Sequence, residues 1–263
     1  TMAQDAFYRP LQTRYSIPAN AGVGLAKVYD FYTAYNRDGT VRSTSSPAGG
    51  DLSVEAVTYT YDSLLRLTSV SGYAGGFTYA QTGELVRVAL NAGGRSAWVV
   101  NTFSEGTKRL TDAVLNRQST EEVHRPASDV KKHYTYDEIG NILSIEDTPA
   151  TGERDIQCFT YDHLRRMTEA WSTASQATEP CAGGAAVSGV GGPAPYQQSY
   201  TLDASGNRRT ERTQVSGQTT GAVERNYVYP SATAARPHAL ASVTEHTQAG
   251  DRLSAFEYDA GGS

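Results

Sequence analysis

Five aspartates recur at the same place in a repeated phrase, and carboxylates of this kind can act as general acids or bases. They are Asp62, Asp137, Asp162, Asp203 and Asp259. Each precedes a stretch typical of a turn, where a short carboxylate accepts backbone N–H groups two residues further on. Because a turn explains a residue that recurs with it, we interpret these aspartates as turn residues and predict no catalytic residue.

The histidines and serines do not have the spacing of a known catalytic or metal site. The five histidines are His124, His133, His163, His238 and His246, with no i, i+4 pair and no H-E-x-x-H motif. The chain has no G-x-S-x-G nucleophile motif. Gly22-Val23-Gly24 lacks the third glycine of a dinucleotide-binding fingerprint. We therefore predict neither a metal site nor a cofactor.

The two cysteines, Cys158 and Cys181, have no C-x-x-C partner, which excludes a zinc site built on thiolates. A disulfide in an oxidising compartment and two free thiols are both open alternatives. The two tryptophans, Trp98 and Trp171, could stack on sugar rings. Packing against neighbours across strands is the interpretation we favour for both rings.

A phrase that runs aromatic, Thr, Tyr, Asp and often reaches Gly occurs seven times, as expected of a repeat protein. The copies span residues 35–41, 59–67, 77–85, 134–142, 159–167, 200–208 and 256–263. Four positions after the second aromatic the chain has Gly39, Gly83, Gly140, Gly206 and Gly262. Leu65 and Arg165 stand there in the two other copies.

Each copy has the chemistry of a β-hairpin. Tyr134 and Tyr136 are two residues apart, so in a strand they share one face while Thr135 lies on the other. Gly140 can take the positive φ that a reversal commonly needs. Because an isolated hairpin is marginally stable, the copies must pair to bury their aromatic face. The repeat aromatics are Tyr59, Tyr61, Phe77, Tyr79, Tyr134, Tyr136, Phe159, Tyr161, Tyr200, Phe256 and Tyr258.

Composition also favours an all-β chain and excludes several classes of function. There are 17 Tyr and 25 Gly, and only 38% of residues are hydrophobic. A net charge of -5 with scattered Lys and Arg excludes a nucleic-acid binder. No segment is apolar enough for a membrane span or a signal peptide, so we expect any targeting segment to lie outside this chain. The run at 181–195 is predicted to be an exposed, mobile loop.

The phased Tyr-Asp pairs and their glycines resemble the YD-repeat, or Rhs-repeat, family of bacterial secreted proteins, Tc toxin C components and teneurins. The resemblance covers residues 29 to 263 and rests on pairs such as Tyr61-Asp62, Tyr136-Asp137 and Tyr161-Asp162. It implies a long antiparallel strip of hairpins that curves into part of a hollow shell, commonly around a toxic C-terminal domain.

We therefore expect residues 1–263 to be one shell segment of about twenty strands, without an internal boundary and part of a longer protein. The expected function is encapsulation of a C-terminal toxin or effector polypeptide by a bacterial secreted or cell-surface protein, with no enzymatic activity. The alternative is an extracellular adhesion module that binds a cell-surface carbohydrate or protein.

Overall fold

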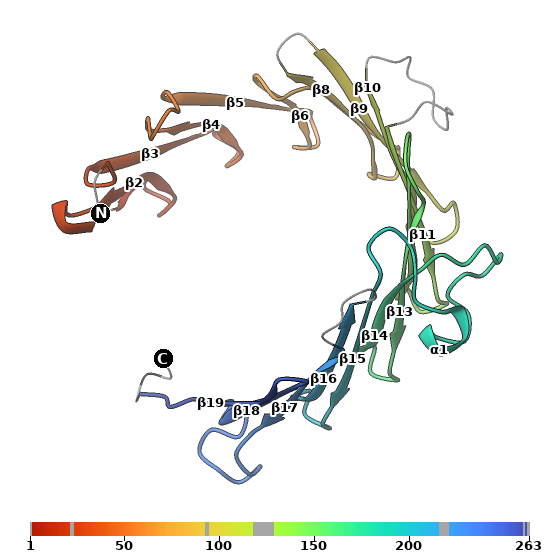
Figure 1. Cartoon of the computed structure of the whole chain (residues 1–263). Helices are drawn as coiled ribbons and strands as arrows, with labels where there is room; N and C mark the ends of the chain where they lie inside the picture. The colour runs from red at the N-terminus through yellow and green to blue at the C-terminus, as the bar shows by residue number, and fades with distance from the viewer. Residues whose placement is uncertain are drawn as a thin grey trace. The chain divides into compact units, whose positions relative to one another are not determined.

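The computed structural model describes residues 2–21, 24–92, 95–117, 129–215, 221–259 and 261. These residues form 19 strands, one 3-10 turn and one short α-helix (Figure 1). The chain groups into two compact units, Thr1–Thr102 with Leu115–Val123 and Phe103–Val114 with His124–Ser263. The expectation of one domain without an internal boundary stays a prediction, because compactness does not measure independent folding.

The first unit is an antiparallel meander in which each strand from β1 to β9 pairs with the next along the chain. A 3-10 turn, η1 (Ala19–Ala21), lies between its second and third strands. The strands are β1 (Met2–Gln4), β2 (Pro10–Ser16), β3 (Val28–Tyr35), β4 (Val41–Ser46), β5 (Glu55–Tyr61), β6 (Leu67–Val70), β7 (Ala74–Tyr79), β8 (Leu85–Ala92) and β9 (Arg95–Phe103).

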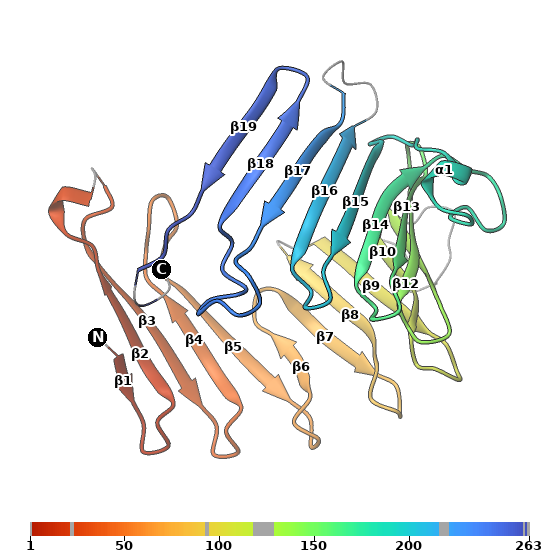
Figure 2. The same cartoon turned by 90° about the horizontal axis from the view of Figure 1, so that it is seen from below.

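The second unit contains residues 110–114 of β10, whose last three residues belong to the first unit, and each strand from β11 to β19 again pairs antiparallel with the next (Figure 2). The helix α1 (Ala185–Ser188) lies in the connection between β14 and β15. The strands are β10 (Leu110–Arg117), β11 (Val130–Tyr136), β12 (Ile142–Pro149), β13 (Asp155–Tyr161), β14 (Met167–Thr173), β15 (Tyr196–Leu202), β16 (Arg208–Val215), β17 (Val223–Val228), β18 (Ser242–Thr247) and β19 (Gly250–Ala255).

The prediction of an all-β fold built from antiparallel hairpins is confirmed. In β11 and β12, Tyr134 lies opposite Ile145 and Thr135 opposite Ser144, so aromatic and hydroxyl side chains alternate between the two faces. No helix in the described ranges has the length and apolar character that a membrane crossing requires.

A β-bulge recurs at the same place in the repeats, and the sequence did not predict it. The register shifts immediately before the second aromatic, or the leucine in its place. The shifts lie at Ala34/Tyr35, Thr60/Tyr61, Thr78/Tyr79, Thr135/Tyr136, Thr160/Tyr161 and Thr201/Leu202. A bulge bends its strand and increases the local right-handed twist.

The buried apolar cluster of the second unit is small. It comprises Ile156, Cys158, Trp171 and Ala185, with Cys181 and Val190 packed against it. Ile156 and Cys158 come from β13 and Trp171 from β14, whereas Ala185 comes from the connection that covers them. Elsewhere most repeat aromatics are half-buried, as expected for a sheet one layer thick.

Candidate functional site

The repeat turns share one geometry. In the turn at 137–141, the N–H of Asp137 donates to the Asn141 carbonyl at 3.0 Å, and the N–H of Gly140 donates to the Asp137 carbonyl at 3.2 Å. This pattern is a three-residue hairpin loop with a left-handed fourth residue. The same two backbone bonds close the turns at 5–9, 36–40, 62–66, 80–84, 162–166 and 203–207.

The aspartate of the phrase organises the turn from inside. Oδ1 of Asp137 accepts the N–H groups of Gly140 and Asn141, both at 2.8 Å. Oδ1 of Asp162 accepts those of Leu164 and Arg166 at 2.8 and 3.0 Å. Asp62 and Asp203 make the corresponding pairs of bonds. Asp259 lies outside any strand, and the turn predicted after it reaches residues outside the described ranges.

Hydrogen bonding holds these carboxyl groups in the ionised form. The backbone N–H of Arg166 lowers the pKa of Asp162, burial opposes this effect, and the Arg166 side chain adds to the lowering. The same causes lower the pKa of Asp62, where Arg66 is the partner. An acceptor fixed in this way stabilises a turn, which is the role that the sequence assigned to these residues.

The fourth position of the turn is left-handed whether or not it is glycine. The φ angles are 92° at Gly39, 103° at Gly83, 100° at Gly140 and 90° at Gly206. Leu65 and Arg165 have φ angles of 60° and 61°, so the two departing copies keep the same type of turn. Gly262 lies outside the described residues.

The sequence also missed a turn of this type at 5–9. Asp5 accepts the N–H groups of Phe7 and Arg9, and Tyr8 has a φ of 61°. This turn has neither an aromatic residue before its aspartate nor a glycine at its fourth position. A related turn, one residue longer, spans 104–109, with a φ of 57° at Lys108.

Two kinds of turn alternate along the chain. We call those at 5–9, 62–66, 104–109 and 162–166 arginine turns, because an arginine ends each of them. We call those at 36–40, 80–84, 137–141 and 203–207 glycine turns, because each has glycine at its fourth position. In the arginine turns Nε of Arg66 and Arg166 donates to the Oδ2 of its own turn's aspartate at 2.8 and 2.7 Å. In the glycine turn at 137–141, Nδ2 of Asn141 donates to Asp137 Oδ2 at 2.7 Å.

In the second unit, each arginine turn reaches the glycine turn that follows it. Nη1 and Nη2 of Arg109 donate to the carbonyls of Asp137 and Glu138 at 2.6 and 2.9 Å. Nη1 of Arg166 donates to the Asp203 carbonyl at 2.7 Å. A Cβ atom built on Gly140 would lie 3.1 Å from Nη2 of Arg109. Gly140 therefore provides both a left-handed backbone and the space for the incoming guanidinium.

The second aromatic of the repeat ties neighbouring hairpins together. Its hydroxyl donates to a main-chain carbonyl of the preceding hairpin at 2.7 to 3.0 Å. The pairs are Tyr61 to Val41, Tyr79 to Leu67, Tyr136 to Leu110, Tyr161 to Ile142 and Tyr258 to Leu240. We call these bonds the tyrosine ties. Burial raises the pKa of the hydroxyls of Tyr61, Tyr136 and Tyr161, which keeps the donor proton in place.

The other repeat aromatics occupy less uniform environments. The Tyr200 hydroxyl donates to Gln198 within its own strand at 2.9 Å, and the guanidinium of Arg208 lies 4.5 Å from the Tyr200 ring centroid. Tyr59, Phe77, Tyr134 and Phe159 are half-buried on their strands. Phe256 and Tyr258, in the last copy, remain 44% and 39% exposed.

A buried ionic cluster on β16 and β17 was not predicted. Glu211 is 9% exposed and accepts bonds from Arg208 at 2.6 Å, Arg225 at 3.0 Å and the Tyr227 hydroxyl at 2.9 Å. Burial opposes ionisation, but these partners lower the pKa of Glu211 overall. Arg225 and Tyr227 lie 14 and 16 positions from Glu211, so no local motif marks the whole cluster.

The described histidines lie on separate strands or turns. His133 Nδ1 is 3.0 Å from Asp112 Oδ1, and His246 Nδ1 is 2.8 Å from Asp251 Oδ1. Within the described ranges, no three His, Cys, Asp or Glu side chains gather closely enough to hold a metal ion. His124 lies outside those ranges.

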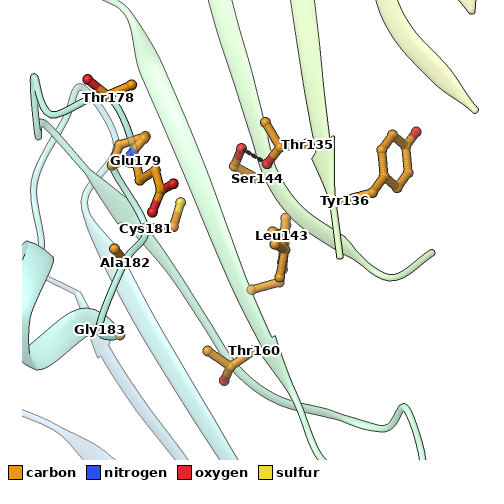
Figure 3. A pocket seen from close by; sticks show the side chains of 13 residues that line it. Thr135, Tyr136, Leu143, Ser144, Thr160, Thr178, Glu179, Cys181, Ala182 and Gly183 are labelled. Carbon is orange, nitrogen blue, oxygen red and sulfur yellow. Dashed lines mark hydrogen bonds between the residues drawn. The ribbon is translucent and has the colours of Figure 1, made fainter. Parts of the chain in front are cut away.

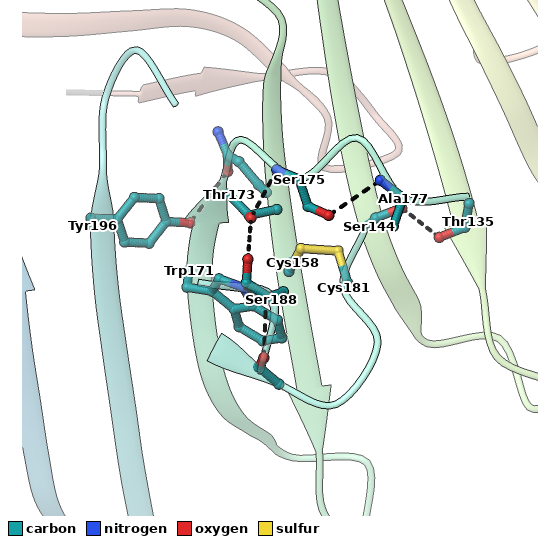
Figure 4. The surroundings of a disulfide bond; sticks show 12 residues. Thr135, Ser144, Cys158, Trp171, Thr173, Ser175, Ala177, Cys181, Ser188 and Tyr196 are labelled. Atoms are coloured by element: carbon teal, nitrogen blue, oxygen red, sulfur yellow. Dashed lines mark hydrogen bonds between the residues drawn. A yellow bond between two sulfur atoms is a disulfide. The ribbon is translucent and has the colours of Figure 1, made fainter. Parts of the chain in front are cut away.

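A disulfide joins Cys158 of β13 to Cys181 in the connection between β14 and β15. We call this connection, residues 174–195, the strap. Figure 4 shows the disulfide beside Trp171, which is completely buried beneath the strap. The indole Nε1 of Trp171 donates to Ser188 Oγ at 2.8 Å.

Two interpretations of this region need correction. The ring of Trp171 is 0% exposed, so it cannot offer a face to a sugar as the glycan-contact hypothesis requires. The run at 181–195 is not a projecting loop, because Ala185 is buried and the Gly191 N–H donates to the Ser172 carbonyl at 3.0 Å. A Cβ on Gly191 would lie 3.2 Å from that of Ala174, so the small residues that indicated a loop allow a close approach to the residue that follows β14. Trp98 remains half-buried, with the Arg87 guanidinium 5.8 Å from its ring centroid.

A cavity of about 600 Å³ lies between the strap and strands β11 to β13 (Figure 3). Its sheet side includes Leu143, Ser144, Phe159 and Thr160, and its strap side is formed by residues 178–184. The walls combine apolar surface with hydroxyl groups and the carboxylate of Glu179. Such a concave mixed surface is typical of small-ligand sites.

No protein-family model matches the chain, and no curated protein matches it. Solved structures do match. The chain resembles a TcdB2-TccC3-Cdc42 crystal structure with a TM-score of 0.57 and 14% identity, covering 99% of this chain and 14% of that one. A TcdB2-TccC3 crystal structure has a TM-score of 0.58 and 14% identity, and the match covers 98% of this chain and 15% of that one.

A third match is the Photorhabdus luminescens Tc holotoxin pore with the TccC3 substitution D651A. It has a TM-score of 0.52 and 15% identity, covering 95% of this chain and 14% of that one. At these identities the likeness concerns the fold alone, and the chain spans about one seventh of the length of the structures it matches. The fold of these toxin-complex structures agrees with the all-β, Rhs-like architecture that the sequence predicts.

Proposed function

We propose that this chain is a wall segment of an Rhs/YD-repeat shell that encapsulates a C-terminal toxin or effector polypeptide. The observation that carries the proposal is the use of the repeat's polar groups within the sheet. Turn carboxylates bind their own backbone, and tyrosine hydroxyls bind the preceding hairpin. The likeness in fold to Tc toxin complexes over nearly the whole chain supports the same proposal.

The physical task of such a wall is to stay continuous. A strand pair held only by its ladder can slip or expose an edge to other chains. The tyrosine ties and the arginine contacts add bonds between consecutive hairpins at fixed positions, and thereby fix their register. In this proposal no residue of the chain is catalytic, and the wall protects its contents by excluding proteases and solvent.

We further propose that the protein is bacterial and is secreted or displayed on the cell surface. The disulfide between Cys158 and Cys181 supports this, since such bonds persist in oxidising compartments.

The test is protease protection in the full-length reading frame. The polypeptide that follows the wall is digested with proteinase K in the full-length protein and, in parallel, when expressed alone. Encapsulation predicts that it survives only in the full-length protein. Equal digestion in both forms would contradict the proposal, while protection that disappears after the wall is opened by denaturant would support it.

A second candidate is an extracellular module that binds a carbohydrate or a protein. The cavity under the strap favours it, because hydroxyl groups, an aromatic ring and a carboxylate line one concavity. Screening on a glycan array would support this function if binding were lost in Glu179→Ala and retained in Trp98→Ala. Binding that depends on Trp98 instead would place the contact on β9.

A further inference from the structure

The two halves of the strap are held to the sheet in different ways. The C-terminal half is attached to β14 by hydrogen bonds. Ser188 receives bonds from Trp171 Nε1 at 2.8 Å and, on its carbonyl, from Thr173 Oγ1 at 3.1 Å. Ser172 Oγ donates to the Ala194 carbonyl at 3.2 Å, and Tyr196 N donates to Ser172 Oγ at 3.0 Å. None of these hydrogen bonds involves the cysteines.

The N-terminal half of the strap, residues 175–184, has hydrogen bonds only to residues within four positions, including two that Ser188 donates to the Gly184 carbonyl, each at 3.0 Å. Ser175 N donates to Thr173 Oγ1 at 3.2 Å, Ala177 N to Ser175 Oγ at 3.3 Å, and Ala182 N to the Glu179 carbonyl at 3.2 Å. Most of its side chains are small and exposed. Across to β13, the covalent link from Cys181 to Cys158 is what holds it, as Figure 4 shows.

The weakly attached half is also the outer wall of the cavity. Figure 3 shows residues of this segment across the cavity from Leu143 and Thr160, and Phe159 also lines the cavity. Releasing this segment would open the cavity and uncover part of its apolar floor. The disulfide is a covalent constraint between this segment and β13, so breaking it would remove that constraint.

We propose that the Cys158–Cys181 disulfide is a redox latch, and that its reduction by a dithiol frees residues 175–184 and opens the cavity while residues 188–196 stay on the sheet. Cys158 is completely buried and Cys181 only half-buried, so a dithiol attacks at Sγ of Cys181. The bond between the two cysteine sulfurs breaks, Cys158 leaves as a thiolate, and a mixed disulfide forms on Cys181.

The second thiol of the reductant then attacks the reductant's other sulfur, which is bonded to Cys181 in the mixed disulfide, and releases Cys181. The reductant leaves as a cyclic or intramolecular disulfide, having given up two electrons. Both cysteines end as thiols that carry the two protons of the dithiol. This inference does not require the shell function, since it concerns only the attachment of the strap.

Hydrogen–deuterium exchange of the whole chain, oxidised and after treatment with dithiothreitol, tests the latch. We expect the amides of 175–184 to exchange at least about ten-fold faster after reduction, with those of 188–196 unchanged. In a Trp98→Phe background, Trp171 fluorescence should keep the emission of a buried indole. Thiol titration should show two thiols in the reduced protein.

Two variants serve as controls. Cys181→Ser should show the fast exchange of 175–184 without reductant, and dithiothreitol should change nothing further. If Cys181→Ser does not fold, the comparison of oxidised and reduced wild-type protein still tests the latch. Exchange in 175–184 that is unchanged on reduction would overturn the latch. Loss of protection throughout β11 to β15 on reduction would also overturn it, because the bond would then hold the sheet and not the strap.

Discussion

Gly140 offers a direct test of the contact between successive turns. The substitution Gly140→Ala adds a Cβ to a residue with a φ of 100°, in a position 3.1 Å from Nη2 and 3.3 Å from Cζ of Arg109. Both the backbone and the guanidinium must respond. Gly206→Ala is the matched control, because its φ is 90° but its Cβ would lie 3.9 Å from Nη1 of Arg166, an ordinary contact.

The expected losses in the free energy of unfolding differ between the two glycines. A left-handed backbone costs an alanine about 1–2 kcal/mol, partly offset by the lower entropy of its unfolded chain. That leaves roughly 1 kcal/mol for Gly206→Ala. Gly140→Ala also displaces Arg109 from the carbonyls of Asp137 and Glu138. Because this arginine is half-buried, we discount its two bonds to about 1 kcal/mol, which gives a total near 2 kcal/mol.

The assay is urea unfolding followed by Trp171 fluorescence in a Trp98→Phe background, which reports on the second unit. In a protein that also carries Arg109→Ala, Gly140→Ala should lower the free energy of unfolding only as much as Gly206→Ala does. The reasoning would be refuted if Gly140→Ala and Gly206→Ala lowered the free energy of unfolding equally in the Trp98→Phe protein. It would also be refuted if the loss caused by Gly140→Ala were the same with and without Arg109.

Three further outcomes follow from the repeat geometry. Leu65→Gly should stabilise the first unit by about 0.5–1 kcal/mol, because Leu65 holds a φ of 60° that glycine adopts freely. Urea unfolding followed by Trp98 fluorescence measures this change, and a loss of stability would contradict the prediction. Tyr161→Phe should destabilise the second unit by about 1 kcal/mol through loss of its bond to the Ile142 carbonyl, whereas Tyr200→Phe, which bonds only within its own strand, should cost less by the same assay. Since the folded pKa of Asp162 lies below its unfolded value, its contribution to stability is complete above the unfolded pKa, near 3.9, and is lost as pH falls through the folded pKa. The urea midpoint should therefore fall as the pH drops below about 4 and fall less in Asp162→Asn, and identical profiles would refute this.

The hairpins could be predicted because their chemistry is local. An aspartate, a left-handed residue and alternating side chains lie within nine residues of one another, and these fix a turn and two faces. The turn at 5–9 escaped prediction because Tyr8 takes the left-handed conformation that glycine marks elsewhere. There the carboxylate and the arginine, rather than glycine, define the turn.

The features that join hairpins could not be predicted from the same patterns. Arg109 and Asp137 are 28 residues apart, and Arg166 and Asp203 are 37 apart, with connections of unequal length between them. The bulge has no side-chain signature either, since the additional residue is leucine at 143 and threonine at 168. Docking of the strap depends on a disulfide that the sequence left open and on close approach by glycine, which equally suits a free loop.

The alternation of arginine and glycine turns has a consequence for how such an array can change in length. Deleting a hairpin with a glycine turn, or duplicating one with an arginine turn, would set two arginine turns in succession, and the guanidinium of the first would meet a side chain where it now meets a glycine. Deleting or duplicating two hairpins together would leave every neighbour unchanged. The packing of the turns therefore tolerates insertion or deletion of two consecutive hairpins better than that of a single hairpin.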